Sequence, residues 1–105
     1  MAATRIIKKF NLTDYNELIL KYKDNIIVNP HVYFRISESQ RKVYKDADLI
    51  NILVAEKPVL FGVQQNGRHT ALFSRKEGYF RIAFNINKTN IEIVTFYNVD
   101  NLPKL

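Results

Sequence analysis

The chain contains no cysteine, no tryptophan, one methionine and two histidines. The lack of thiols excludes disulfide bonds, thiolate metal sites and a cysteine nucleophile. The histidines, His31 and His69, are far apart, and neither has an acidic triad or a second histidine at ligand spacing. We therefore expect neither a metal site nor a cofactor, and any catalysis is expected to be metal-free.

Long hydrophobic runs are also missing. The N-terminus has no apolar stretch of signal-peptide length, and no segment approaches the length that spans a bilayer. These absences predict a soluble, cytoplasmic protein with no membrane partner. The 105 residues, 47% of them hydrophobic, suffice for one core but not for two ordinary domains. We expect one domain, with an N-terminal segment and helix (1–30), a functional core (31–97) and a tail (98–105).

Acidic residues are fewer than basic ones. The chain has 10 acidic and 16 basic residues, a net charge of +6 and a pI near 9.7. Such a surplus favours polyanions through phosphate contacts and counterion release. Most of it lies between His31 and Arg81, where nine basic residues face five acidic ones. Nucleic acid is therefore the first partner to consider, although the signal is unspecific.

The first half of the chain shows two helical patterns. Apolar residues recur at i, i+3, i+4 and i+7 from Thr13 or Asp14 to about residue 24, and a similar stripe runs from 46 to 57. Between them, Asn29-Pro30 breaks the chain, and residues 31–44 fit either a strand or a helix. Residues 4–10 suit a short strand or a basic arm.

The second half reads as strands. Four segments alternate or are rich in β-formers, at 58–65, 68–74, 79–86 and 91–97, and the first two meet across Asn66-Gly67, a strong hairpin signal. Helices followed by strands indicate the α+β class. We expect N-terminal helices packed on one face of a four-stranded antiparallel β-meander, with the other face at least partly open to a ligand.

Metal-free RNA cleavage needs a base for the 2′-hydroxyl, an acid for the leaving 5′-oxygen, and cations for the charge on phosphorus. Histidine titrates near neutrality, and arginine stays charged and grips phosphate. His31 with Arg35 and Arg41 forms such a cluster in the sequence. Arg81 and Thr95 would reach it from the sheet.

Each of these residues also has a structural interpretation. His31 follows Asn-Pro and suits a loop or a helix cap, and its basic neighbours suit a solvated helix face. His69 follows the hairpin turn, where an exposed edge position is expected. Arg81 stands between apolar residues of a central strand, so it needs an exposed face or a partner. A four-residue final turn would put Arg81 and Thr95 on different faces, whereas an odd turn or one bulge would unite them.

The order of these parts resembles a known family. The sequence has His31-x-x-x-Arg35, Arg41, a helix from 46 to 58, Arg81 in Tyr-Phe-Arg-Ile-Ala-Phe, and a final Ile-Val-Thr-Phe-Tyr at 93–97. This resembles the barnase, EndoU, colicin E5/D and RelE-like superfamily of small ribonuclease toxins. The spacing from His31 to Arg41 is wider than in the family pattern, and residues 1–30 have no counterpart.

The resemblance implies a metal-independent endoribonuclease that holds RNA on a concave sheet face and cleaves it through a 2′,3′-cyclic phosphate. It implies His31 as acid or base, Arg35, Arg41 and Arg81 as phosphate-binding cations, and either Thr95 or Tyr97 as a hydroxyl near the scissile phosphate. Further substrate contacts are expected from Arg41, Lys42, Arg68, Tyr79 and Tyr97. It also implies tRNA or mRNA as the target, and a cognate antitoxin or immunity protein as partner.

Two other classes of function remain open from the sequence. One is a nonenzymatic RNA- or DNA-binding module, in which Tyr33, Tyr79, Phe80 and Tyr97 would stack on bases. The other is a protein-interaction domain, such as a phage or viral inhibitor that binds an acidic partner. The aromatic residues do not discriminate, because six Tyr and seven Phe are also what a small core without Trp would use.

Overall fold

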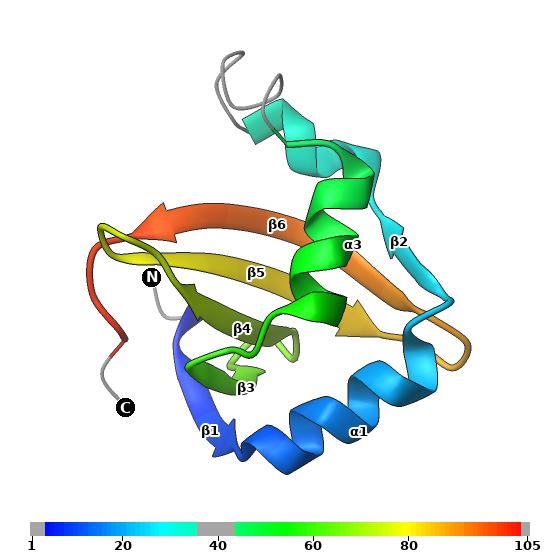
Figure 1. Cartoon of the computed structure of the whole chain (residues 1–105), viewed down its shortest axis with the longest axis horizontal. Helices are drawn as coiled ribbons and strands as arrows, with labels where there is room; N and C mark the ends of the chain where they lie inside the picture. Colours follow the sequence, from blue (N-terminus) through cyan, green and yellow to red (C-terminus); the bar gives the residue numbers. More distant parts are fainter. Residues whose placement is uncertain (1–3, 36–43, 104–105) are drawn as a thin grey trace.

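The computed structural model describes residues 4–35 and 44–103 and has the predicted α+β class (Figure 1). Its strands are β1 (Ile6–Phe10), β2 (Ile26–Val28), β3 (Leu60–Gln64), β4 (His69–Ser74), β5 (Tyr79–Ile86) and β6 (Ile91–Val99). Its helices are α1 (Leu12–Tyr22) and α3 (Asp46–Ala55), and a 3-10 helix, η2 (Pro30–Arg35), lies between them. All six strands belong to one mixed sheet in the order β1-β3-β4-β5-β6-β2.

The predicted meander is present as β3 to β6, which pair antiparallel in chain order. The turn between β3 and β4 contains Gly67 at φ +87°, a backbone conformation that a glycine adopts without strain. β6 continues to Val99, so the segment expected to be a tail begins inside the sheet.

The prediction of a sheet with only four strands is wrong. β1 pairs antiparallel with β3, and β2 pairs parallel with β6, so each meander edge carries one more strand. Helices therefore do not precede all strands, since β1 comes before α1. Both added strands are short, and β1 carries Lys8 and Lys9, which are common on edge strands but blur a sequence pattern.

The two helices have their N-termini stabilised by carboxylates. Asn11 caps α1, accepting a bond from the Asp14 N–H at 2.8 Å, and the Asp14 carboxylate accepts one from the Asn11 N–H at 3.3 Å. In α3 the Asp48 carboxylate accepts a bond from the Lys45 N–H at 2.9 Å. Reciprocal bonds of this kind satisfy orphan N–H groups of the first turn.

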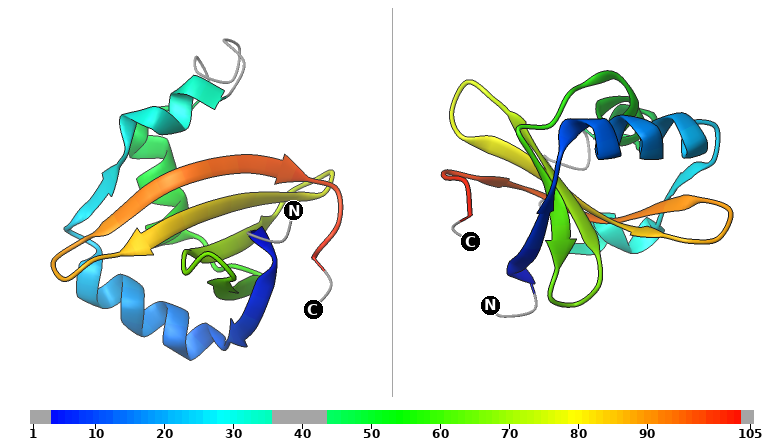
Figure 2. Two further views of the ribbon diagram at one scale, coloured as in Figure 1. Left: turned by 180° about the vertical axis from the view of Figure 1, so that it is seen from behind. Right: turned by 90° about the horizontal axis from the view of Figure 1, so that it is seen from below.

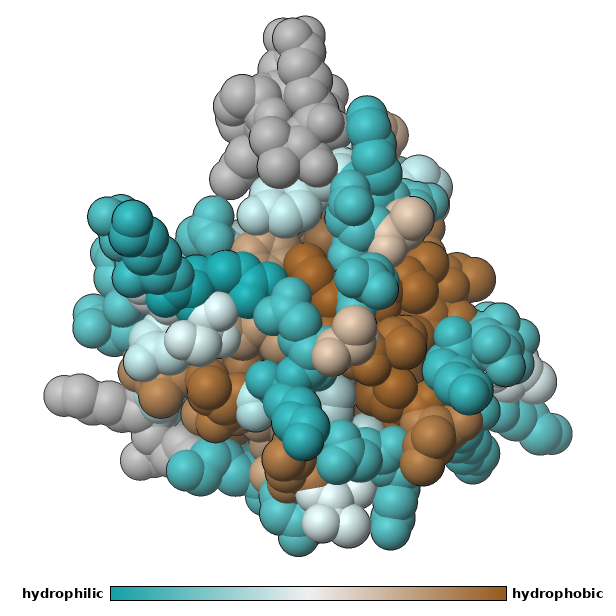
Figure 3. Space-filling view, viewed as in Figure 1, coloured by the Kyte–Doolittle hydropathy of each residue, from teal (hydrophilic) through white to brown (hydrophobic). Residues whose placement is uncertain are grey.

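Both helices cover the same face of the sheet (Figure 2). Their buried side chains, such as Tyr15 of α1 and Leu53 of α3, join one core with Phe73, Ile82 and Phe84 of the sheet. The space-filling view of this side shows hydrophobic surface among polar side chains over α3 and its surroundings (Figure 3). The opposite face, called the open face below, is covered by neither α1 nor α3 (Figure 2).

A bulge settles the register that the sequence left open. Arg81 pairs with Tyr97 and Ala83 with Thr95, but Phe84 pairs with Ile93, so Val94 is the extra residue of β6. Because side chains alternate along a strand, Arg81, Thr95 and Tyr97 all lie on the open face. No helix in the described part of the chain is long and apolar enough to span a membrane.

Candidate functional site

Arg81 lies at the centre of the open face, yet it is only 6% exposed. Its Nε donates to the Thr70 hydroxyl at 3.0 Å, and its Nη2 donates to the Gln64 side-chain oxygen at 2.8 Å and to the Thr4 carbonyl at 2.7 Å. These three acceptors are neutral, and burial lowers the pKa of Arg81. The guanidinium thus ties β3, β4 and the N-terminal segment to β5.

Two of the predicted stacking tyrosines also lie on the open face. The Tyr97 ring lies 5.7 Å from the Arg81 guanidinium carbon, in cation–π contact, which leaves less of the ring for a base. Tyr79 packs against a small buried cluster of Ile6, Leu60 and Leu72. Tyr79 and Arg81 therefore already have partners within the protein. A substrate phosphate would have to displace the Thr4 carbonyl to reach Nη2 of Arg81.

The third predicted stacking tyrosine and Phe80 lie on the helix side. Tyr33 packs edge-on against Phe96, and its hydroxyl donates to the Asp46 carboxylate. Burial and this hydrogen bond raise the pKa of Tyr33. Phe80 is buried and stacks on Tyr44 at 5.1 Å between ring centroids. Neither ring is available to a nucleic acid on the open face.

His31 is placed at the edge of the sheet by the pairing of β2 with β6. Val28 pairs with Ile93, and the next residue, Asn29, donates its backbone N–H to the Ile93 carbonyl at 2.9 Å. Since the two strands run parallel, the chain enters η2 alongside Val94 and Thr95. His31 is exposed there, and its N–H donates to the Asn29 side-chain oxygen at 2.9 Å.

η2, which contains His31, therefore packs beside β6, the strand that holds Thr95, although the described residues form no hydrogen bond between these two side chains. Thr95 is half-buried on the open face, and the side chain of Asn29 reaches the same strand through a 3.1 Å bond to Glu92. Arg81 stands on the neighbouring strand, diagonally from Thr95. No contact between His31 and Arg81 is formed within the described residues.

Phe34 is an aromatic side chain beside His31 that sequence reasoning missed. It is 68% exposed, and its ring stands edge-to-face with the imidazole at 5.1 Å between centroids. An apolar ring of this size is costly to leave in water. Its signal in the sequence was weak, because the alternation of Val32, Phe34 and Ile36 suggested a half-buried strand.

The structure describes only some of the other residues predicted to bind phosphate. Arg35 is the last residue of η2, whereas Arg41 and Lys42 lie outside the described residues. Arg68 is half-buried beside the β3–β4 turn, where its N–H donates to the Asn66 side chain at 3.0 Å. It immediately precedes β4, which stands three strands from β2 in the order of the sheet.

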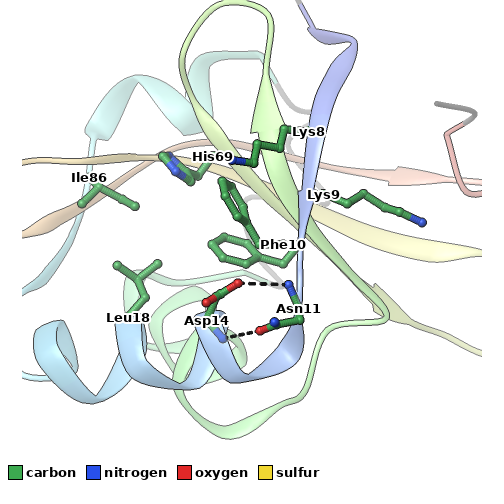
Figure 4. A pocket seen from close by; sticks show the side chains of 9 residues that line it. Lys8, Lys9, Phe10, Asn11, Asp14, Leu18, His69 and Ile86 are labelled. Carbon is green, nitrogen blue, oxygen red and sulfur yellow. Dashed lines mark hydrogen bonds between the residues drawn. The ribbon is translucent and has the colours of Figure 1, made fainter.

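His69 does not have the exposed edge position that the sequence suggested. β1 covers β3, so β4 is interior to the sheet, and His69 points to the helix side with Ala71 and Phe73. Its ring lines a cleft between β1 and α1 of about 690 Å³, together with Lys8, Phe10 and Leu18 (Figure 4). Burial lowers the pKa of His69, which keeps the imidazole neutral at pH 7.

The described residues contain no cluster of three or more His, Asp or Glu side chains that could hold a metal ion. No family model matches the chain, and no curated protein or solved structure is significantly similar to it. Its function is therefore inferred from its own residues.

Proposed function

We propose that the chain is a metal-independent endoribonuclease of the toxin type, with its reaction centre at the edge of β6. His31 is the acid or base, the Thr95 hydroxyl binds the scissile phosphate, and Phe34 stacks on a neighbouring base. The observation that carries the proposal is the parallel pairing of β2 with β6, which brings His31 to the strand that holds Thr95.

The chemistry follows from these groups. The 2′-oxygen of the substrate bonds to phosphorus while the bond from phosphorus to the 5′-oxygen breaks, which gives a 2′,3′-cyclic phosphate and a 5′-hydroxyl. The His31 imidazole takes the 2′-hydroxyl proton, and the 5′-oxygen takes a proton from water. The Thr95 hydroxyl donates to a nonbridging oxygen, where negative charge grows.

We infer that the positive charge for phosphate binding comes from basic residues that follow His31 in the sequence. Arg35 ends η2, and Arg41 and Lys42 come shortly after it in the chain. Arginine stays charged at every pH of interest and binds phosphate oxygens in pairs. We assign Arg81 a structural role on the open face, because its Nε and Nη2 already donate hydrogen bonds to acceptors within the chain.

The biological setting is part of the same proposal. The enzyme would act on tRNA or mRNA in the cytoplasm, and a cognate antitoxin or immunity protein would cover its basic surface. This setting rests on the family resemblance and on the net charge of +6.

The test is incubation of the purified chain with total RNA in EDTA, with the wild type beside His31→Ala and Thr95→Val. Loss of a general base lowers cleavage by about 100-fold or more. Loss of the Thr95 hydroxyl is expected to lower it about tenfold. Thr89→Val, the same change at an exposed position of the β5–β6 turn, is the matched control and should cleave like the wild type.

Each outcome bears on the proposal. Cleavage that survives EDTA and disappears in His31→Ala supports it. Intact RNA that is retarded on a gel would replace it with a nonenzymatic binding module. If RNA is neither cleaved nor retarded, the protein-interaction domain becomes the better account.

A further inference from the structure

The cleft between β1 and α1 has no part in the proposed reaction. In the order of the sheet, β1 is the edge opposite to β2, and no described residue of β2 or η2 lines the cleft. Its volume of about 690 Å³ falls in the range typical of small-molecule sites. Apolar side chains form one wall of it, and polar groups converge from three elements, β1, α1 and β4 (Figure 4).

The apolar wall contains the rings of Phe10 and Phe61, tilted by 42° to each other, and the His69 ring is stacked on both. His69 stacks on Phe10 at 6.0 Å and 17° and on Phe61 at 5.9 Å and 29°. Behind the wall, Phe61 is parallel to Phe84 within 6°. Leu18 and Ile86 also line the cleft. A flat aromatic ligand would extend this stack, because aromatic rings favour offset parallel contact.

The polar groups of the cleft can form further ion pairs and hydrogen bonds. The Lys8 ammonium lies 5.3 Å from the Phe10 ring centroid, and no acid of the described residues lies within ion-pairing distance of it. The described residues also form no hydrogen bond to the ring nitrogens of His69, although the ring is half-buried. A cation and an imidazole beside an apolar wall suit a ligand that joins an anion to a flat ring.

Asp14 adds an acceptor at the α1 side of the same cleft. Its carboxylate accepts only a long bond of 3.3 Å from the Asn11 N–H among the described residues, so lone pairs remain for a ligand. The exocyclic amino group of adenine, guanine or cytosine is a donor that suits such an acceptor. The cleft thus offers a stacking wall, a cation and an acceptor in one place.

We propose that this cleft binds a nucleotide unit, with its base against Phe10 and its phosphate at Lys8. The ligand is either a free nucleotide or one nucleotide of an RNA strand, since both carry the same base and phosphate. The proposal does not depend on RNA cleavage at the other edge of the sheet.

The test is titration of the full chain with adenosine 5′-monophosphate, followed by NMR shifts of backbone amides in β1, β4 and α1. Adenosine, inorganic phosphate and a short RNA oligonucleotide are titrated separately, the RNA in the His31→Ala background. If the RNA shifts these amides at lower concentration than the monophosphate does, the strand is the source. The reverse order identifies the free nucleotide.

Two variants test the contacts. Lys8→Met should weaken nucleotide binding about tenfold, as loss of one charge-assisted hydrogen bond does, and should leave adenosine binding unchanged. His69→Phe keeps the stacking ring and removes the nitrogens, so it should also weaken nucleotide binding. Lys21→Met is the matched control, because the Lys21 ammonium also lies over an aromatic ring, 5.2 Å from the Tyr22 centroid, and Lys21 does not line the cleft, whereas both Lys8 and Lys9 do (Figure 4).

The proposal is overturned if neither the monophosphate nor the RNA gives saturable shifts at the cleft. It is also overturned if Lys8→Met and Lys21→Met weaken binding equally, because net charge alone would then explain the effect. Unchanged thermal unfolding of Lys8→Met shows that the variant is folded. RNA cleavage is measured separately from nucleotide binding. Either proposal can therefore fail while the other holds.

Discussion

Replacement of Arg81 by methionine tests the structural role of the buried guanidinium. The substitution keeps an unbranched apolar side chain in the site and removes the donors to Thr70, Gln64 and Thr4. Gln64 and Thr70 are buried, at 2% and 0% exposure, so their oxygens cannot readily turn to water. A buried acceptor left without its partner costs about 1–3 kcal/mol.

The Thr4 carbonyl belongs to an exposed residue and regains water, so two acceptors carry most of the loss. Relief from burying a charge offsets part of it. We expect Arg81→Met to lower the free energy of unfolding by about 2–3 kcal/mol. The assay is urea denaturation monitored by tyrosine fluorescence. The slope of the free energy of unfolding against urea concentration should be unchanged if the folded and unfolded states keep their compactness.

Arg75→Met is the matched control. Arg75 forms a 2.8 Å ion pair with Glu56, but their side chains are 31% and 40% exposed, and such pairs contribute about 0–1 kcal/mol. The double variant Arg81→Met/Gln64→Leu should recover part of the lost stability, because it removes an orphaned acceptor with its donor. A loss of stability in Arg81→Met no larger than that in Arg75→Met would show that the buried hydrogen bonds of Arg81 do not stabilise the fold.

Three further predictions concern other parts of the chain. Burial lowers the pKa of His69 below its unfolded value of 6.5, so the unfolded chain binds more protons, and stability should fall as pH drops below about 6.5; His69→Phe should flatten this pH dependence in urea titrations. Phe34→Ala should lower the specificity constant for RNA cleavage about tenfold through lost base stacking, while the thermal midpoint barely moves; an unchanged constant would remove Phe34 from the site. Gly62→Ala should lower the free energy of unfolding by about 1–3 kcal/mol, since the new methyl would meet the Lys8 carbonyl and, at 2.9 Å, Ile6 Cγ2. If calorimetry shows no loss of stability, β1 moves away from the methyl without cost.

The helices and the meander were predictable because their signals are local. Apolar spacing marks α1 and α3, and Asn66-Gly67 marks the first hairpin. The edge strands were not predictable, because β2 has three residues and its pairing with β6 depends on a contact more than 60 positions along the chain. The α+β class therefore followed from sequence, whereas the six-stranded order did not.

The candidate site was predictable only in part, because it depends on register and on edges. The bulge at Val94 leaves no mark in composition, yet it decides that Arg81 and Thr95 share a face. The His69 cleft had a usable signal, since His69 alternates with Ala71 and Phe73, both of which are buried. That signal was outweighed by the expectation of an edge position, which β1 removes.

The most direct test of the proposed ribonuclease is end-group analysis on a defined RNA incubated with the chain in EDTA. The account predicts 2′,3′-cyclic phosphate and 5′-hydroxyl ends with the wild type, and intact RNA with His31→Ala at the same protein concentration. Cleavage by His31→Ala at the wild-type rate, or products that carry 5′-phosphates, would contradict it.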